Sequence, residues 1–180
     1  MSPVLTHAPE LLPKAQGVAL AFFDVDGVLT DGGLYFSATG ETLKRFHVLD
    51  GHGMQLLQAG AITPVVISGR DGKPLRNRLR ALGVECHLGI GDKHAMAQEC
   101  LRSHQLAWEQ AAVIGDDWPD LALIQRCAFS AAPPGAHAEV LAAVDHVTQR
   151  PAGAGAAREF CDLLLVAAGR YAELLAKACT

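Results

Sequence analysis

This sequence lacks the cysteine and histidine spacings that mark disulfide-rich or zinc-stabilised proteins. It has five cysteines, an odd number, and no C-x-x-C pair. None of its eight histidines stands in an H-E-x-x-H pattern. Scattered thiols are typical of proteins that keep cysteine reduced, so we expect a cytoplasmic protein without a disulfide framework or a zinc site. The cysteines are Cys86, Cys100, Cys127, Cys161 and Cys179.

Long apolar runs and an excess of positive charge are also missing. The longest apolar runs, such as residues 163–169, fall far short of the roughly 18 residues that a membrane span needs. The N-terminus has no basic region followed by an apolar stretch, so we expect no signal peptide and no membrane partner. A net charge of −4 argues against a nucleic-acid partner, although it does not exclude an anionic small molecule.

Length and composition predict one folded domain over residues 1–180. Half of the 180 residues are hydrophobic and 19% are charged, which is enough apolar side chain for a buried core. Residues 1–16 contain three prolines and no clear periodicity, so we expect a loose N-terminal arm. We expect residues 151–180 to form a C-terminal loop and helix.

Strands and helices are predicted to alternate along most of the chain. Such alternation favours a mainly parallel sheet between two layers of helices, a three-layer α/β/α fold. Strands are expected at 18–23, 62–67, 84–87, 111–114, 128–130 and 145–148. Helices are expected at 52–59, 72–82, 93–103, 119–126, 136–143 and 156–177, and a small hairpin from 34–36 and 43–48.

Polar side chains follow three of these strands, and a lysine begins one of the helices. Asp24 and Asp26 follow the first strand, and Ser68 ends a later one. Lys93 begins a helix, and Asp116 follows the strand at 111–114. The carboxyl ends of parallel strands share one edge of the sheet, where ligands bind, so we expect these residues to converge.

These residue types suit the transfer of a phosphoryl group. Asp24 and Asp116 offer the oxygen ligands that Mg²⁺ prefers. Asp24 can attack phosphorus to form an aspartyl-phosphate, and Asp26 can protonate the leaving alcohol and later accept a proton from water. The Ser68 hydroxyl and the Lys93 ammonium can hold the phosphoryl oxygens.

Each of these residues also has a simpler interpretation. A D-x-D-G segment is common in turns, a serine often caps a helix, and a single lysine is usually solvated. Asp117 and Asp120 stand at a helix start, where the helix dipole favours carboxylates. Only the joint order of the four segments favours a catalytic site.

The segment Asp24–Thr30 matches the pattern D-x-D-G-[VT]-[LI]-[TS] throughout, and the chain thereby resembles the haloacid-dehalogenase superfamily of phosphotransferases. Ser68, Lys93 and the segment 116–120 match its other three motifs. The resemblance implies a Rossmann-like fold and Mg²⁺-dependent hydrolysis of a phosphate ester. It assigns Asp24 as the nucleophile. It also makes Asp26 the acid/base, with its backbone carbonyl on the metal beside Asp24 and Asp116.

Two further segments resemble the capless 3-deoxy-D-manno-octulosonate 8-phosphate (KDO 8-phosphate) phosphatases. Residues 43–54 resemble their F-x-V-x-D-G-x-G-I segment, and residues 155–165 resemble their C-terminal segment. Only a short hairpin stands where related enzymes carry a cap. The resemblance, over about residues 18–170, implies release of phosphate from KDO 8-phosphate in lipopolysaccharide precursor synthesis. It also implies a homotetramer whose hairpins meet at its centre and whose active sites are completed by neighbouring subunits.

The residues that choose the sugar match the family less well. Leu49, Gln55 and Ala154 are neutral at places where the family usually has basic residues. Two alternatives therefore stay open: a phosphatase for another nonulosonate or small sugar phosphate, and a non-catalytic oligomeric relative. His47 is as compatible with hairpin packing as with a sugar contact. The resemblance implies substrate contacts from Asp26, Thr30, His47, Asp50, Gly51, Gly69, Arg70, Arg78 and Lys93.

Overall fold

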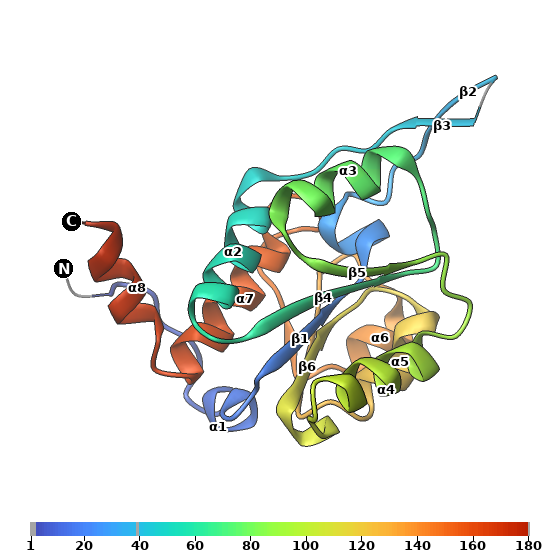
Figure 1. The fold of residues 1–180 in the computed structure, drawn as a ribbon. Coiled ribbons are helices and arrows are strands. Elements are labelled where there is room, and N and C mark those ends of the chain that lie inside the picture. The colour runs from blue at the N-terminus through green and yellow to red at the C-terminus, as the bar shows by residue number, and fades with distance from the viewer. Residues whose placement is uncertain (1–2, 39, 180) are drawn as a thin grey trace.

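The computed structural model describes residues 3–38 and 40–179, and it confirms the predicted α/β fold with a parallel sheet (Figure 1). Six strands form one sheet in the order β5-β4-β1-β6-β7-β8, and every neighbouring pair is parallel. The strands are β1 (Leu20–Phe23), β4 (Thr63–Ser68), β5 (Glu85–Leu88), β6 (Ala111–Ile114), β7 (Phe129–Ala132) and β8 (His146–Val147).

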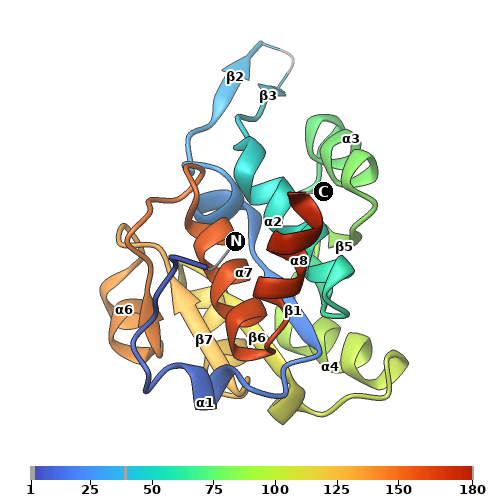
Figure 2. The ribbon, with the colours of Figure 1, turned by 90° about the vertical axis from the view of Figure 1, so that its left-hand side faces the viewer.

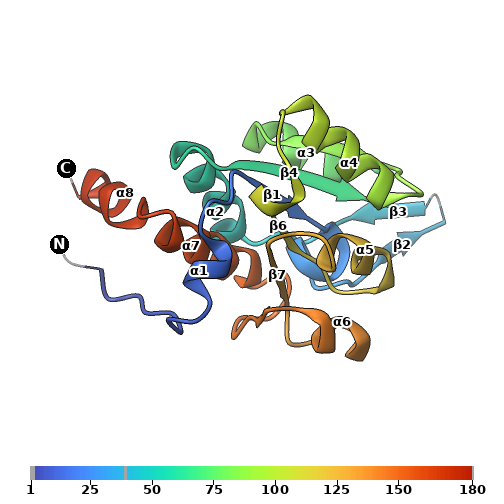
Figure 3. The ribbon, with the colours of Figure 1, turned by 90° about the horizontal axis from the view of Figure 1, so that it is seen from below.

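Helices cover both faces of the sheet, as Figures 1 and 3 show. Successive strand residues point to opposite faces, so Phe23 packs in one apolar core and Phe22 in the other. The first face carries α1 (Leu12–Ala15), α2 (Val48–Ala59), α3 (Lys73–Leu82) and α7 (Ala156–Ala167). The second carries α4 (Lys93–Ser103), α5 (Leu121–Ile124) and α6 (Ala138–Ala143).

Three short helical segments lie in the connections. One is a turn at Val25–Leu29, and two are 3₁₀ turns at Trp108–Gln110 and Trp118–Asp120. The last replaces the start of the helix predicted over 119–126, so that α5 is only one turn long. None of the helices described is long and apolar enough to cross a membrane.

The predicted hairpin is present but shorter than expected. Strands β2 (Tyr35–Ser37) and β3 (Gly40–Leu43) pair antiparallel and project away from the sheet and its helices (Figure 1). The strand predicted over 43–48 is wrong, because the chain leaves the hairpin at Leu43 and turns the Lys44 side chain into a buried position. Thr39, within the predicted turn, lies outside the described residues.

Helix α2 starts at Val48, four residues before the predicted start at His52. Glycines at 51 and 53 lower the helix propensity of this segment, and tertiary contacts override that preference. Gly53 faces α7, where a Cβ would lie 3.1 Å from Cys161 Sγ. Figure 2 shows α2 and α7 side by side, so the glycine allows the two helices to approach closely.

The single helix predicted over 156–177 is wrong, because the chain breaks into α7 and α8 (Tyr171–Ala178). Gly169 takes φ +68°, a backbone conformation that ends a helix. The Arg170 amide donates to Leu165 O at 2.9 Å and the Gly169 amide to Val166 O at 3.0 Å, which is the Schellman arrangement. These bonds occupy carbonyls that would otherwise continue the helix.

The last residues of the N-terminal arm attach it to the rest of the domain. Residues 3–8 have no regular structure, but Ala15 of α1 is buried and Leu11 packs on the core. Lys14 Nζ lies 2.6 Å from Asp145 Oδ1.

Candidate active site

The candidate site lies where the strand order reverses. The chain passes from β1 to β4 and β5 on one side, and then to β6, β7 and β8 on the other. Connections on the two sides diverge at this point, which leaves a crevice at the carboxyl ends of the central strands. Asp24 follows β1, Asp116 and Asp120 follow β6, and Lys93 begins α4.

Lys93 joins two of these carboxylates. Its Nζ lies 2.5 Å from Asp24 Oδ1 and 2.7 Å from Asp120 Oδ1. All three residues are buried, with 8%, 8% and 3% exposure for Lys93, Asp24 and Asp120. Asp120 Oδ2 also accepts a hydrogen bond from the Asp116 amide at 3.2 Å, which holds the loop after β6 in place. The predicted meeting of Asp24, Lys93 and the loop after β6 is therefore observed.

Asp24, Asp116 and Asp120 offer oxygen atoms that lie within 4.8 Å of one another, and we name these three residues the carboxylate cluster. Burial, and then repulsion from Asp120, raise the pKa of Asp24 to about 6 despite the Lys93 ammonium. Burial raises the pKa of Asp116 to about 8, assisted by the charges of Asp24 and Asp120. One ammonium does not compensate three carboxylates, so the cluster fits a hard divalent cation such as Mg²⁺.

Asp26 makes a different set of contacts. Its Oδ1 accepts hydrogen bonds from Lys44 Nζ and, at 3.4 Å, from Thr30 Oγ1. Its Oδ2 is buried without a hydrogen-bond partner in the described chain, and Arg70 Nε lies 3.6 Å from that atom. The metal contact that the family resemblance implies for Asp26 uses its backbone carbonyl, and the carboxylate faces Lys44 and Arg70 instead.

Lys44 is a site residue that the sequence analysis missed. It is 8% exposed, and its Nζ also lies 2.9 Å from Glu41 Oε1. Burial lowers the pKa of Lys44, but hydrogen bonds to Asp26 and Glu41 outweigh burial and raise it. A lysine after a surface hairpin is usually solvated, so its only sequence signal was its place within the 43–54 segment.

The end of β4 and the loop that follows it carry Ser68, Gly69 and Arg70, and Arg70 reaches Asp26. Ser68 is buried, and its Oγ accepts a hydrogen bond from the Arg70 amide at 3.2 Å. This bond shapes the turn and leaves the serine O–H proton for another acceptor. Gly69 and Arg70 are exposed, and Arg70 extends toward Asp26.

The structure groups the other predicted substrate residues around α2. The Asp50 carboxylate accepts hydrogen bonds from the Arg158 amide at 2.9 Å and the Gly155 amide at 3.3 Å, so it caps α7. Gly51 lies against Arg78, since a Cβ there would be 2.2 Å from Arg78 Nη2. Together with His47 these residues border a cavity of about 10 Å³, room for no more than one water. They position α2 and α7.

A larger hollow of about 720 Å³ lies between the N-terminal arm and the start of α7. Leu49 and Ala154, two of the neutral positions in the sequence, border it. Arg150 and Arg158 border it too. Arg158 falls within the 155–165 segment and Arg150 outside every quoted segment, and neither was predicted to contact the substrate.

Proteins of known function are similar to this chain over most of its length. No protein-family model matches the sequence. The 3-deoxy-D-manno-octulosonate 8-phosphate phosphatase KdsC of Salmonella typhi is 37% identical over 172 residues, which cover 95% of this chain and 90% of that protein.

Many solved structures share the fold, and two of them show the family and the superfamily. One is the 3-deoxy-D-manno-octulosonate 8-phosphate phosphatase of Moraxella catarrhalis in complex with a magnesium ion, a phosphate ion and KDO. It has a TM-score of 0.90 and 32% identity over 95% of this chain and 99% of that one. The other is a putative HAD superfamily (subfamily III A) hydrolase of Legionella pneumophila, with a TM-score of 0.87 and 39% identity over 90% of each chain. This chain belongs to the 3-deoxy-D-manno-octulosonate 8-phosphate phosphatase family within the haloacid-dehalogenase superfamily.

Proposed function

We propose that this protein is a Mg²⁺-dependent phosphatase that converts KDO 8-phosphate to KDO and inorganic phosphate in lipopolysaccharide precursor synthesis. The observation that carries the proposal is the buried Asp24–Lys93–Asp120 group beside Asp116, at the reversal of the sheet, in a chain of this family. We infer that residues 1–180 act as one catalytic domain.

Asp24 is the proposed nucleophile. One of its carboxylate oxygens attacks phosphorus, the P–O bond to the sugar breaks, and an aspartyl-phosphate forms. Lys93 holds the carboxylate at 2.5 Å and keeps it oriented. The same ammonium stabilises the negative charge on the phosphoryl oxygens during the transfer. The Ser68 O–H, which its turn leaves free to donate, supplies a further proposed contact to these oxygens.

Asp26 is the proposed proton carrier. Lys44 holds Oδ1, so the unbonded Oδ2 is the atom we assign to proton transfer. It protonates the departing sugar oxygen, and in the second half of the reaction it accepts a proton from the water that attacks the aspartyl-phosphate. This second attack releases phosphate and restores Asp24.

Asp24, Asp116 and the Asp26 backbone carbonyl would hold Mg²⁺, with Asp120 supporting the shell. When bound, the ion neutralises the carboxylates and the phosphoryl group, so that an anionic nucleophile can approach an anionic substrate. The raised pKa values of Asp24 and Asp116 support this assignment, because a buried carboxylate cluster needs a cation to stay ionised.

The proposed substrate contacts begin at Arg70, which lies at the surface beside Asp26. Asp50 and Gly51 act by positioning α2. Arg150 and Arg158 offer the charge that Leu49 and Ala154 lack, which suits an acidic sugar. The proposed set of residues that contact or position the substrate is Asp26, Thr30, His47, Asp50, Gly51, Gly69, Arg70, Arg78 and Lys93.

A homotetramer with shared active sites is part of the proposal. The hairpin β2–β3 exposes apolar side chains, including Phe36 at 64% and Leu43 at 50%. Such side chains on a projecting hairpin favour contact with other chains. We also propose a cytoplasmic location, which five cysteines without a disulfide support.

A panel of sugar phosphates tests the proposal. Purified protein with Mg²⁺ should release phosphate fastest from KDO 8-phosphate, and EDTA should stop the release. A preference for a sugar phosphate without a carboxylate would overturn the substrate and favour the alternative suggested by Leu49, Gln55 and Ala154. Failure to hydrolyse any ester with Mg²⁺ present would favour a non-catalytic relative.

A further inference from the structure

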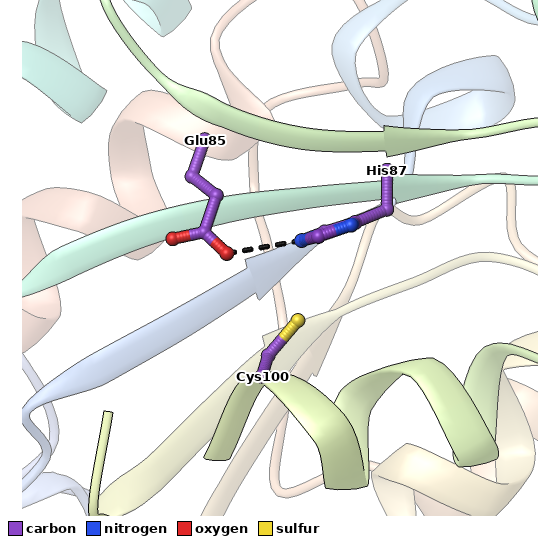
Figure 4. Close-up of side chains that lie close together, drawn as sticks. All are labelled: Glu85, His87 and Cys100. Carbon is purple, nitrogen blue, oxygen red and sulfur yellow. Dashed lines mark hydrogen bonds and ion pairs between the residues drawn. The ribbon is translucent and has the colours of Figure 1, made fainter. Parts of the chain in front are cut away.

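Three metal-ligating side chains converge at a second place, between the edge strand β5 and helix α4. Glu85 and His87 are two residues apart on β5, so they point to the same face of the strand. Cys100 lies on α4, which covers that face. Figure 4 shows the three side chains directed toward one another, and their ligand atoms lie within 4.8 Å of one another.

The contacts within this group are those of a prepared ligand set. His87 Nε2 lies 2.9 Å from Glu85 Oε1 (Figure 4), and His104 Nε2 lies 2.8 Å from Glu85 Oε2. His104 therefore holds the second carboxylate oxygen, as an outer hydrogen-bond partner does for a metal-bound carboxylate. Cys100 is 2% exposed, while the Glu85 and His87 side chains are 35% and 29% exposed, so the group is open to solvent on the strand side.

We propose that Glu85, His87 and Cys100 form a second metal site that is distinct from the carboxylate cluster. This second site binds a divalent transition metal such as Zn²⁺ and fastens β5 to α4. Thiolate, imidazole and carboxylate are the ligands that Zn²⁺ takes in proteins, whereas Mg²⁺ prefers oxygen ligands alone. Zn²⁺ bonds of about 2.0–2.3 Å require ligand atoms about 3.5 Å apart, and side-chain rotation can close the remaining distance.

Metal binding to this group would require the loss of the thiol proton of Cys100. Burial raises the pKa of Glu85, but hydrogen bonds from His87 and His104 outweigh burial and hold it below its usual range, so the carboxylate is ionised. Burial and the Glu85 and Glu99 carboxylates raise the pKa of the Cys100 thiol to about 11. A bound cation would lower the pKa of the thiol, and the thiol proton would pass to solvent.

The proposed metal site joins the two elements on either side of the connection that precedes Lys93. Residues 89–92 connect β5 to α4, and Lys93 is the first residue of that helix. A metal bridge from Glu85 and His87 to Cys100 would brace both ends of this connection. The role is structural, because none of the three residues belongs to the carboxylate cluster.

Co²⁺ is the probe that separates the two sites. A thiolate bound to Co²⁺ gives a strong near-ultraviolet charge-transfer absorption, and an all-oxygen site does not. With the full chain in excess Mg²⁺, we expect this absorption in the wild type at one Co²⁺ per chain. Zn²⁺ should displace the Co²⁺ and remove the absorption. The Asp116→Asn variant should keep the absorption although its phosphatase activity is lost, so this test is independent of the proposed function.

Four variants complete the test. Cys100→Ser and His87→Gln should each lose the absorption, and His104→Gln should weaken Co²⁺ binding by about 10–100-fold. Cys86→Ser is the matched control, because Cys86 stands between the two β5 ligands but is exposed and points to the other face. It should keep the absorption. The proposal would be overturned if the wild type lacked the absorption, or if the Cys100→Ser or His87→Gln variant kept it. Loss of the absorption in the Cys86→Ser variant would also overturn it.

Discussion

The Lys93 ammonium lies 2.5 Å from the Asp24 carboxylate, although 69 residues separate them in the sequence. Asp24 is held by the end of β1 and Lys93 by the start of α4. The pair is buried, so its geometry is set by the packing of the sheet and helix rather than by solvent. This single contact connects the proposed nucleophile to the proposed source of positive charge.

Replacement of Lys93 by methionine should damage stability and activity together. It leaves Asp24 and Asp120 buried without their cation, and losing one partner of a buried ion pair typically costs about 3–5 kcal/mol. Urea unfolding measures this loss, and phosphate release measures the activity. Lys73→Met is the matched control, since Lys73 is also the first residue of a helix but is exposed. Equal effects of the two substitutions would contradict the role of Lys93.

Asp24→Asn should reduce turnover by about 10⁴-fold or more while the protein stays folded, because the amide is a poor nucleophile. Acid-quenched wild-type enzyme should carry a phosphoryl group during turnover, and the variant should carry none. Full activity in this variant, or phosphoryl label at another residue, would remove Asp24 as the nucleophile.

Gly27→Ala should disrupt the carboxylate cluster. A Cβ at Gly27 would lie 2.0 Å from Asp116 Oδ2, and the residue has φ +91°. We expect activity to fall by about 100-fold, as when a reacting group is displaced by about 1 Å. Gly17→Ala is the matched control: it has a similar φ of +85° but no atom within 4 Å of the new Cβ.

Both substitutions should share a backbone penalty of about 1–2 kcal/mol in the free energy of unfolding. Only Gly27→Ala should also lose Mg²⁺ affinity, which isothermal titration calorimetry measures. Unchanged Mg²⁺ binding in Gly27→Ala would show that Asp116 tolerates the displacement.

A rise in pH should lower the free energy of unfolding, and the addition of Mg²⁺ should raise it. The pKa values of Asp24 (about 6) and Asp116 (about 8) lie above the ordinary value of 3.8. The metal-free folded protein therefore binds more protons than the unfolded chain, and its free energy of unfolding should fall as pH rises from about 5 to about 9. Mg²⁺ competes with these protons, so the stabilisation by Mg²⁺ should be larger at the upper end of this range.

Melting temperatures measured with and without Mg²⁺ across this pH range test the effect. Mg²⁺ at about 100 times its Kd should add about 2.7 kcal/mol, and each kcal/mol raises Tm by about 2–4 °C in a chain of this size. The Asp116→Asn variant should show a weaker pH dependence. A Mg²⁺ effect that grows as pH falls would contradict the assignment of the site.

Phe36→Ser should weaken the proposed tetramer, because it removes the most exposed large apolar side chain of the hairpin. Light scattering after size exclusion should show the mass fall from four chains toward one, with a loss of activity if the sites are shared. Val147→Ser, on the edge strand β8, is the control and should leave the mass unchanged. A monomeric wild type would remove the shared site from the proposal.

Several parts of the fold could be predicted from local pattern. The run before Asp24 is apolar because β1 is buried on both faces, and polar loops follow the strands because their carboxyl ends meet at one edge. Errors arose where distant contacts or turn bonds decided a boundary. Helix α2 starts early because α7 packs against Gly53, and the helix predicted over 156–177 breaks at Gly169 because of the capping bonds there.

The sequence by itself determined the alternation of strands and helices. It also determined which polar residues, such as Asp24, Ser68 and Asp116, stand at the strand ends, because periodicity and motif order are local properties. Only the tertiary structure placed Lys44 on Asp26, turned Asp50 into a cap for α7, and brought Cys100 to Glu85 and His87. These contacts join residues far apart along the chain, and no spacing in the sequence records how a sheet and its helices pack.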